Sequence, residues 1–411
     1  MKLSKFVLKI PYKSKIILYN TVNDMIVLCD YKDFLNKKSK EILKANGFFD
    51  NDNELLQKYM KQITKKRTQL DITISLTEGC NLCCKYCSQS TVKKNSYITK
   101  EVLDDIVEYV KICIKNYGYK SLSIHLFGGE PLLMQKEILY LNDKLEKLSV
   151  PVNYYMDTNG VLLKKEFISK LNNITFCITL SEKSDHDNLR ITEGNIGTYD
   201  IIMKNIRDVQ DVLDVSHKMM IRYNVNHLNI NRLEEFLKEI KDFKITDIVV
   251  AYTDNYDNNV KTNELSYMQY KKWNSTKVIP LLIKYGYPVE LPASSYYCKG
   301  YERYSLKVFS DGRIGMCNAY DINKTKTTLN EIIEDYKKTH ILKESFKEER
   351  NLSNVIDNQC KKCKYLYICN GKYFCREKPC EFLDYDIEKY IKTYVEIIFV
   401  KTYWPFLLKK N

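Results

Sequence analysis

The sequence lacks a long, uninterrupted hydrophobic run. The apolar stretch near its C-terminal end, "YVEIIFVKTYWPFLL", is interrupted by Lys401 and Pro405 and is too short to cross a bilayer. The first residues, "MKLSKFVLKIPYKSK", carry the positive charge of a signal peptide but not its apolar segment. We therefore expect no membrane span and a cytoplasmic location.

The sequence also lacks internal repeats, low-complexity segments and any recognised nucleic-acid-binding module. The net charge of +13 could suit an acidic partner, but the lysines are spread along the chain, and codon bias alone can explain their abundance. We expect no nucleic-acid partner. A length of 411 residues with 44% hydrophobic and 28% charged residues fits a globular protein of two or three domains.

Cysteine, in contrast, is abundant, with fourteen residues. Thiols in a reducing cytosol rarely form structural disulfides, so clustered cysteines indicate metal binding or catalysis. One cluster is "CNLCCKYC" (80–87) and a second lies between residues 298 and 380. Four cysteines, one of them inside the first cluster, lie mostly in apolar patterns and are expected to be small core residues. They are Cys29, Cys83, Cys113 and Cys177.

Strand and helix patterns alternate from Asp71 onward, as expected for an α/β fold. Helical apolar spacing, for example at Leu103, Ile106 and Val110, lies between the strands. Six such units imply a parallel sheet with right-handed crossovers, and six are too few to close an eight-stranded barrel. We expect an open, partial (β/α)6 TIM-like barrel. Its predicted strands are 71–76, 121–127, 152–157, 174–180, 218–226 and 245–252.

One face of these strands is polar. Thr73 and Ser75 share a face of the first strand, His125 lies on the second, and Arg222 and Asn224 lie on the fifth. A sheet packed on both faces would be apolar on both. A polar inner face suits an open barrel whose lumen holds a ligand, although a core hydrogen bond is an equal explanation for any single residue.

The first cysteine cluster follows the end of the first predicted strand, where barrel enzymes place their chemistry. The spacing Cys80-x3-Cys84-x2-Cys87 gives three thiolates, which can bind three irons of a four-iron, four-sulfur cluster. Zinc would need a fourth ligand, such as Cys83, but the adjacent Cys83 and Cys84 tend to point apart. Three ligands leave one iron open.

This motif, with Tyr86 before its last cysteine, resembles the signature of radical S-adenosylmethionine (radical SAM) enzymes. The resemblance implies that the open iron chelates S-adenosylmethionine. It also implies that an electron from the cluster cleaves the cofactor to a 5′-deoxyadenosyl radical, which abstracts hydrogen from the substrate. An external one-electron reductant of the flavodoxin or ferredoxin type would supply that electron. Cys83 departs from the usual residue and receives no role.

Further segments at successive strand ends resemble the same family. "FGGEPLL" (127–133) resembles the segment that holds the methionine amino group, with glycines that let backbone approach the ligand. "DTNG" (157–160) ends the third strand, and "ITLSEKSDHDNLR" (178–190) resembles the segment that reaches the ribose, without the family's usual Asp-Gly-Pro. Each motif alone is commonly a turn, but their order supports the resemblance. The cofactor contacts it implies are Gly128, Gly129, Glu130, Asn159, Ser181 (or Thr179) and Arg222.

The second cysteine set resembles the SPASM domain, an auxiliary-cluster extension of many radical SAM enzymes. "FSDGRIGMCNAY" (309–320) looks like its β-hairpin, with a turn at Asp311-Gly312. The resemblance implies two auxiliary four-iron clusters, and the alternative is a pair of zinc knuckles. Five residues separate Cys369 from Cys375, where the family usually has three. One cluster would use Cys360, Cys363, Cys369 and Cys380, and the other Cys298, Cys317, Cys375 and a non-cysteine or open site.

We therefore expect an N-terminal α+β domain (1–69), the partial barrel (70–286), the SPASM domain (287–383) and a C-terminal helix (384–411). The first domain, with short strands at 5–10, 15–19 and 25–30 followed by two helices, resembles the winged-helix element that recognises leader peptides. Such elements bind by strand addition, with nearby basic residues holding acidic leader residues. A small decorating domain is the alternative.

The resemblance implies modification of a ribosomally made precursor peptide with a leader, by thioether or carbon–carbon crosslinking or by epimerisation. The first alternative is formylglycine formation in sulfatases. Enzymes of that type carry a catalytic Asp directly after the cysteine matched by Cys317, where this chain has Asn318, which cannot accept a proton as a carboxylate does. The second alternative, a non-enzymatic iron–sulfur electron carrier, needs neither an open iron nor the Gly-Gly-Glu segment. No single catalytic residue is assigned.

Overall fold

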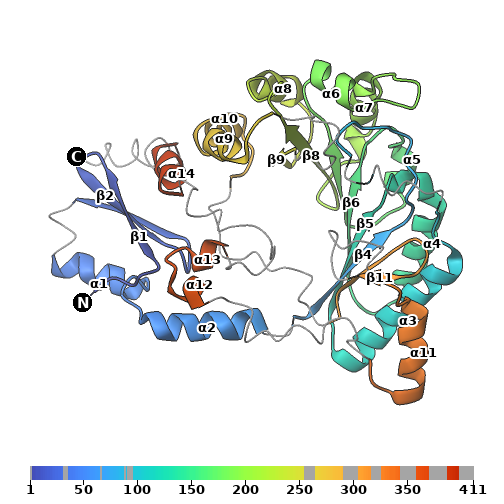
Figure 1. Cartoon of the computed structure of the whole chain (residues 1–411), viewed down its shortest axis with the longest axis horizontal. Helices are drawn as coiled ribbons and strands as arrows, with labels where there is room; N and C mark the ends of the chain where they lie inside the picture. The colour runs from blue at the N-terminus through green and yellow to red at the C-terminus, as the bar shows by residue number, and fades with distance from the viewer. Residues whose placement is uncertain are drawn as a thin grey trace. The chain divides into compact units, whose positions relative to one another are not determined.

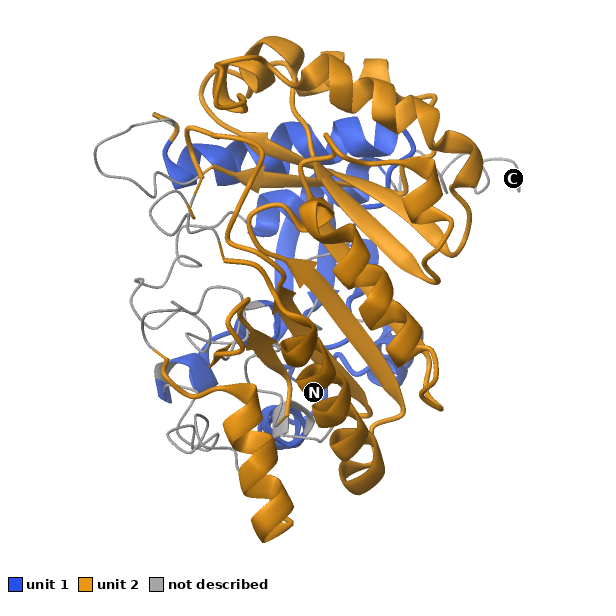
Figure 2. Cartoon of the chain, turned by 90° about the vertical axis from the view of Figure 1, so that its right-hand side faces the viewer, with its two compact units in different colours: residues 1–65, 266–298, 350–411 blue, residues 66–265, 299–349 orange. Residues whose placement is uncertain are grey.

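We describe a computed structural model of the chain (Figure 1). It describes residues 2–30, 36–64, 67–87, 89, 96–253, 264–289, 304–315, 325–342, 358–369 and 387–397. The chain forms two compact units, which Figure 2 colours separately. The larger comprises residues 66–265 and 299–349, and the smaller comprises residues 1–65, 266–298 and 350–411. The boundaries predicted after residues 69, 286 and 383 stay predictions.

The larger unit is built on an eight-stranded sheet with the order β11-β10-β4-β5-β6-β7-β8-β9. Strands β4 to β9 run parallel in sequence order, and each begins and ends within two residues of its predicted range. The α/β class and the parallel core of a partial barrel are thus confirmed. The strands are β4 (Gln69–Ser75), β5 (Ser121–Phe127), β6 (Val152–Thr158), β7 (Ile174–Thr179), β8 (His217–Val225) and β9 (Asp247–Tyr252).

Helices connect these strands and lie on the outer side of the sheet (Figure 1). The first, α3, shows why they form: the Thr99 side chain accepts from the Val102 N–H at its start, and Gly118 ends it in the left-handed conformation. None of the described helices is long and apolar enough to cross a membrane. The helices are α3 (Lys100–Tyr117), η3 (Pro131–Met134), α4 (Gln135–Leu145), α5 (Lys165–Ile168), α6 (Lys183–Leu189), α7 (Tyr199–Asp208), η4 (Gln210–Val212) and α8 (Leu233–Ile240).

The strand register brings polar side chains together on one face of the sheet. His125 on β5 lies beside Thr73 of β4 and Tyr155 of β6. Because side chains alternate along a strand, Asp157, two residues beyond Tyr155, has the same orientation. The other face carries residues such as Ile124 and Leu126, which are fully buried. The polar face therefore surrounds the lumen, and the apolar face packs under the helices.

The predicted hairpin at Asp311-Gly312 is present. Strands β10 (Leu306–Val308) and β11 (Ile314–Gly315) pair antiparallel, and Gly312 has a φ of +82°. An additional feature was not predicted: β10 also pairs in parallel with β4, so the returning chain extends the barrel sheet. Helix α11 (Leu329–Thr339) follows and begins with a capping box formed by Thr328 and Glu331.

The smaller unit contains an antiparallel sheet of β1 (Val7–Tyr12), β2 (Lys15–Asn20) and β3 (Met25–Asp30), with β2 in the centre. The first strand lies two residues later than predicted. One face packs on α14 through Ile387 and Ile391, and the other on Leu43 and Phe48. The helices are α1 (Lys37–Ala45), α2 (Asp52–Thr64), α9 (Tyr267–Trp273), η5 (Asn274–Val278), α10 (Ile279–Lys284), α12 (Asn358–Lys362), α13 (Leu366–Cys369) and α14 (Ile387–Tyr394).

Candidate functional site

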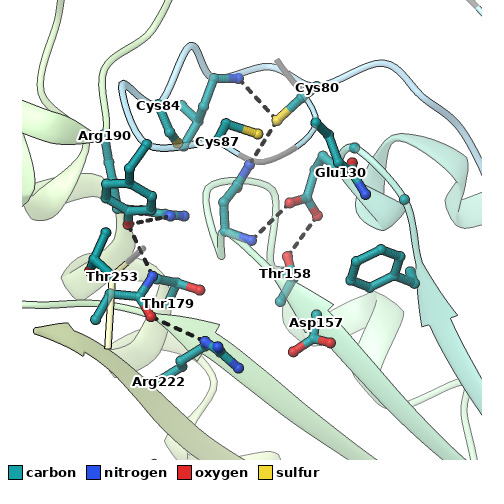
Figure 3. Close-up of a pocket in the computed structure, with 18 of the residues that line it drawn as sticks. Cys80, Cys84, Cys87, Glu130, Asp157, Thr158, Thr179, Arg190, Arg222 and Thr253 are labelled. Atoms are coloured by element: carbon teal, nitrogen blue, oxygen red, sulfur yellow. Dashed lines mark hydrogen bonds between the residues drawn. The ribbon is translucent and has the colours of Figure 1, made fainter. Parts of the chain in front are cut away.

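A pocket of about 300 Å³ lies within the larger unit (Figure 3). One part of its wall comes from the cysteine loop after β4 and the Gly-Gly-Glu segment after β5. The other part comes from the lumen side chains of β6 to β9. The lining residues are Cys80, Leu82, Cys84, Tyr86, Cys87, Gln89, Phe127, Gly128, Gly129, Glu130, Asp157, Thr158, Asn159, Thr179, Arg190, Arg222, Asn224, Tyr252 and Thr253.

The three cysteines of the predicted cluster site all line this pocket. The Cys80 Sγ accepts hydrogen bonds from the Leu82 backbone N–H at 3.4 Å and from the Asn159 amide at 3.8 Å. Burial raises the pKa of the Cys80 thiol to about 11. Cys83 is exposed and does not line the pocket, so the prediction that it is a core residue is wrong. Cys29 is only partly buried. Cys113 and Cys177 are buried as expected.

The Gly-Gly-Glu segment packs directly against the cysteine loop. The Gly129 N–H donates to the Thr77 carbonyl at 2.7 Å, and the Glu130 N–H donates to the Gly79 carbonyl at 2.9 Å. A Cβ on Gly129 would lie 2.0 Å from the Gly79 oxygen, and one on Gly128 (φ +135°) would lie 2.4 Å from the Thr77 oxygen. Both glycines line the pocket, but the close backbone approach that requires them is to the loop.

Glu130 is fully buried with its carboxylate fixed at both ends. Oε1 accepts from the Leu132 N–H at 3.0 Å and from the Thr158 hydroxyl at 2.6 Å, and Oε2 accepts from the Asn159 N–H at 2.8 Å. Burial raises the pKa of Glu130, and these hydrogen bonds oppose that shift. A carboxylate offers about four acceptor positions, so the group still has room for another donor.

The other predicted cofactor contacts divide into two groups. Asn159, Thr179 and Arg222 line the pocket, and the Arg222 Nε donates to the Asn224 side chain at 3.1 Å. Ser181 is not among the lining residues. Its hydroxyl instead contacts the buried carboxylate of Asp185 at 3.3 Å. Of the two alternatives in that segment, only Thr179 reaches the pocket.

Arg190 lines the pocket but was given no role from the sequence. Its side chain is buried, and its Nη1 donates to the Tyr86 hydroxyl at 3.0 Å. The Arg190 Nε is buried without a hydrogen-bond partner among the described residues. A buried guanidinium requires an anionic or hydrogen-bonding partner. The only sequence signal was a cationic residue at the end of the segment that resembles the ribose-binding motif.

A second unpredicted feature is a His–Asp pair in the lumen. The His125 Nε2 lies 2.7 Å from Asp157 Oδ2, and Asp157 lines the pocket. The rings of Tyr155 and Phe127 pack edge-on against the imidazole at 5.0 and 5.5 Å between centroids. The polar inner face predicted the location of His125 but not its partner.

The tail cysteines are described in part. Cys363 donates its backbone N–H to the Cys360 carbonyl at 3.0 Å, and its Sγ accepts from the Tyr365 N–H at 3.4 Å. Cys369 ends α13. Cys298, Cys317, Cys375 and Cys380 lie outside the described residues. The two auxiliary clusters therefore stay predictions.

The donor set around the cysteine loop fits an iron–sulfur cluster. Among the residues that the structure describes, no three His, Cys, Asp or Glu side chains converge on one metal ion. A four-iron cluster does not require such convergence, because each thiolate binds a different iron. The site suits an anionic cluster and an anionic group of its cofactor. Three thiols line the pocket, N–H groups donate to Cys80, and the Arg190 Nε has no hydrogen-bond partner among the described residues.

Residues 74–256 match the family profile of the Radical SAM superfamily. The chain contains a radical SAM domain. The match begins at the end of β4 and runs through β9, so it includes the cysteine loop and the whole pocket wall. The family implies S-adenosylmethionine and one four-iron, four-sulfur cluster as cofactors. The chain is a radical SAM enzyme.

Curated relatives of the radical SAM domain have different activities. The chain is 27% identical over 313 residues to a GTP 3′,8-cyclase of Helicobacter pylori. The aligned region covers 69% of this chain and 91% of the relative. It is 22% identical over 360 residues to a cysteine-type anaerobic sulfatase-maturating enzyme of Clostridium perfringens, covering 78% and 92%.

Solved structures support the same fold beyond the radical SAM domain. anSMEcpe with bound AdoMet and Kp18Cys peptide superposes with a TM-score of 0.59 at 20% identity, covering 83% of this chain and 98% of that one. Streptococcus suis SuiB bound to precursor peptide SuiA superposes with a TM-score of 0.54 at 18% identity, covering 90% and 94%.

Proposed function

We propose that this radical SAM enzyme modifies a ribosomally synthesised precursor peptide, by a thioether or carbon–carbon crosslink or by epimerisation. The main observation in support is the composition of the pocket wall, in which the cysteine loop and a polar, charged lumen line one cavity. The cysteine part would hold the cofactors, and the lumen part would receive a substrate side chain. Peptide-bound structures of anSMEcpe and SuiB, which share this fold, support a peptide as substrate.

Cys80, Cys84 and Cys87 would hold three irons of the cluster, and the pocket beside them would hold S-adenosylmethionine. When bound, these groups would supply the radical chemistry that removes a hydrogen atom from the substrate. Glu130, fixed by three hydrogen bonds, would accept from the cofactor's ammonium. Its buried site removes competing water, which strengthens that interaction.

The lumen part of the wall is assigned to the substrate, and Thr179 and Arg222, which the resemblance gives to the cofactor, would lie where cofactor and substrate meet. Asp157 presents a carboxylate whose orientation His125 fixes, and Arg222 presents a cation from β8. Thr179 lies on β7, the strand between those of Asp157 and Arg222. Such opposite charges on rigid strands favour a polar substrate residue whose hydrogen-bonding groups match both ends.

The smaller unit would bind the leader of the precursor peptide. Its sheet ends at β3, which is paired with β2 on one side only among the described residues. Strand addition at such an edge supplies backbone hydrogen bonds, and the basic residues Lys37, Lys38 and Lys40 of the following helix suit an acidic leader. A flavodoxin- or ferredoxin-type protein would supply electrons, and the tail cysteines would hold two auxiliary four-iron clusters.

Formylglycine formation is the second candidate, favoured by the sulfatase-maturating relative and by the anSMEcpe fold. Asn318 in place of the catalytic Asp argues against it. Asn318 lies outside the described residues, so this argument rests on sequence alone.

The test is anaerobic incubation of reconstituted protein with dithionite, S-adenosylmethionine and one substrate at a time. Substrates are leader-bearing precursor peptides, a sulfatase peptide with its target cysteine, and GTP. Mass spectrometry should detect a change only in a precursor peptide. A crosslink would remove two hydrogens, whereas epimerisation would leave the mass unchanged in ordinary water and add deuterium in heavy water. Turnover of the sulfatase peptide or of GTP in its place would refute the proposal.

A further inference from the structure

The segment that follows helix α6 docks along the cysteine loop. The Cys83 N–H donates to the Ile191 carbonyl at 2.7 Å, and the Lys85 N–H donates to the Leu189 carbonyl at 2.9 Å. The Lys85 Nζ adds a bond of 3.1 Å to the Asn188 side chain. Two backbone bonds at alternate residues resemble a short sheet ladder. They fix the position of the residue between them, Arg190, relative to the cysteines.

The Arg190 guanidinium enters the pocket beside those cysteines (Figure 3). Its Nη1 donates to the Tyr86 hydroxyl, and the Asn224 amide donates to the same oxygen at 3.3 Å. Tyr86 lies between Cys84 and Cys87 in the sequence, so Arg190 is tied to the loop by its own side chain and by the backbone carbonyls of its two neighbours. Arg190 is 7% exposed, which leaves it little screening by water.

Arg190 lines the same pocket as Cys80, Cys84 and Cys87. No carboxylate of the described residues forms an ion pair with it. The cysteines, once deprotonated by a metal, would be its counter-charge together with the buried Glu130 carboxylate of the same pocket, which interacts electrostatically with Arg190.

We propose that Arg190, held by Tyr86, raises the reduction potential of the cluster bound by Cys80, Cys84 and Cys87. This inference rests on the proposed radical SAM site. Reduction adds a negative charge to the cluster, and a fixed cation in a water-poor pocket favours the more negative state. Cluster potentials respond to net charge and to hydrogen bonds near the sulfurs. Arg190 is thus a positioning residue that makes the cluster easier to reduce.

The test is an anaerobic redox titration of the full, reconstituted chain, followed by the EPR signal that disappears in Cys84→Ala. Neither S-adenosylmethionine nor substrate is added. Arg190→Gln should shift the reduction equilibrium at least tenfold toward the oxidised cluster, about 59 mV for one electron. Arg190→Lys should restore most of that potential because it keeps the charge. Arg207→Gln, an exposed arginine on α7, is the matched control and should have the wild-type potential.

An unchanged potential in Arg190→Gln with normal iron content would overturn the inference. If that variant takes up no iron, Tyr86→Phe decides: freeing the guanidinium should lower the potential, and an unchanged value overturns the inference. A purely structural role would reduce iron content or thermal stability without moving the potential. Wild-type protein that binds no cluster at all would instead refute the proposed function.

Discussion

The contact between the Gly-Gly-Glu segment and the cysteine loop leads to a quantitative prediction for Gly129→Ala. The new Cβ would lie 2.0 Å from the Gly79 oxygen, 2.5 Å from its carbonyl carbon and 2.9 Å from the Glu78 oxygen. All three atoms are backbone, so no side chain can rotate away. Relief requires the two segments to separate by more than about 1 Å. That movement breaks the 2.7 and 2.9 Å bonds from Gly129 and Glu130.

Two lost buried hydrogen bonds at about 1–3 kcal/mol each predict a destabilisation of about 2–6 kcal/mol. Urea unfolding of the cluster-free protein measures it, with iron uptake as a second readout. Gly194→Ala is the control, because its nearest atoms lie 3.8 Å or farther away and its φ is not positive. We expect no change for Gly194→Ala. A loss below about 0.5 kcal/mol in Gly129→Ala, with normal iron uptake, would refute the close packing of these segments.

Three further predictions concern other parts of the chain. Cys84→Ala should abolish reductive cleavage of S-adenosylmethionine, measured as 5′-deoxyadenosine, and retained turnover would refute its role as ligand. Cys363→Ala should reduce product formation more than cofactor cleavage; equal loss of both would contradict a separate auxiliary cluster. Burial, helped by Arg190, holds the pKa of His186 well below its usual value. Only the unfolded state therefore binds that proton below about pH 6.5, and acid destabilises the fold by up to about 1.4 kcal/mol per pH unit through this group. Urea midpoints at several pH values should fall less steeply in His186→Gln, and an unchanged slope would contradict the assignment.

Sequence periodicity predicted the six parallel strands because buried strands and helices differ in apolar spacing. The cysteine spacing and the motifs at strand ends located most of the pocket wall, because parallel strands bring their carboxyl ends to one edge. Cys80, Glu130 and Asn159 illustrate this: they are far apart in sequence but meet in hydrogen bonds.

The remaining features depend on contacts that periodicity does not encode. Arg190 follows a short helix, and the backbone bonds of its neighbours Leu189 and Ile191 to the cysteine loop hold it at the pocket. Ser181 follows the end of a strand as expected, yet its hydroxyl donates to the buried Asp185 carboxylate and not into the pocket. Cys83 sits in an apolar-looking context, but the loop turns it outward. The pairing of β10 with β4 joins segments more than two hundred residues apart, which no local pattern predicts.

The most direct test of the central claim is one experiment on anaerobically reconstituted protein. Iron and sulfide are counted per chain, and 5′-deoxyadenosine is measured after addition of dithionite and S-adenosylmethionine. The account predicts 5′-deoxyadenosine together with about four irons if only the cysteine loop is loaded, or about twelve if both auxiliary clusters are present. Zinc in place of iron, with no 5′-deoxyadenosine, would contradict it.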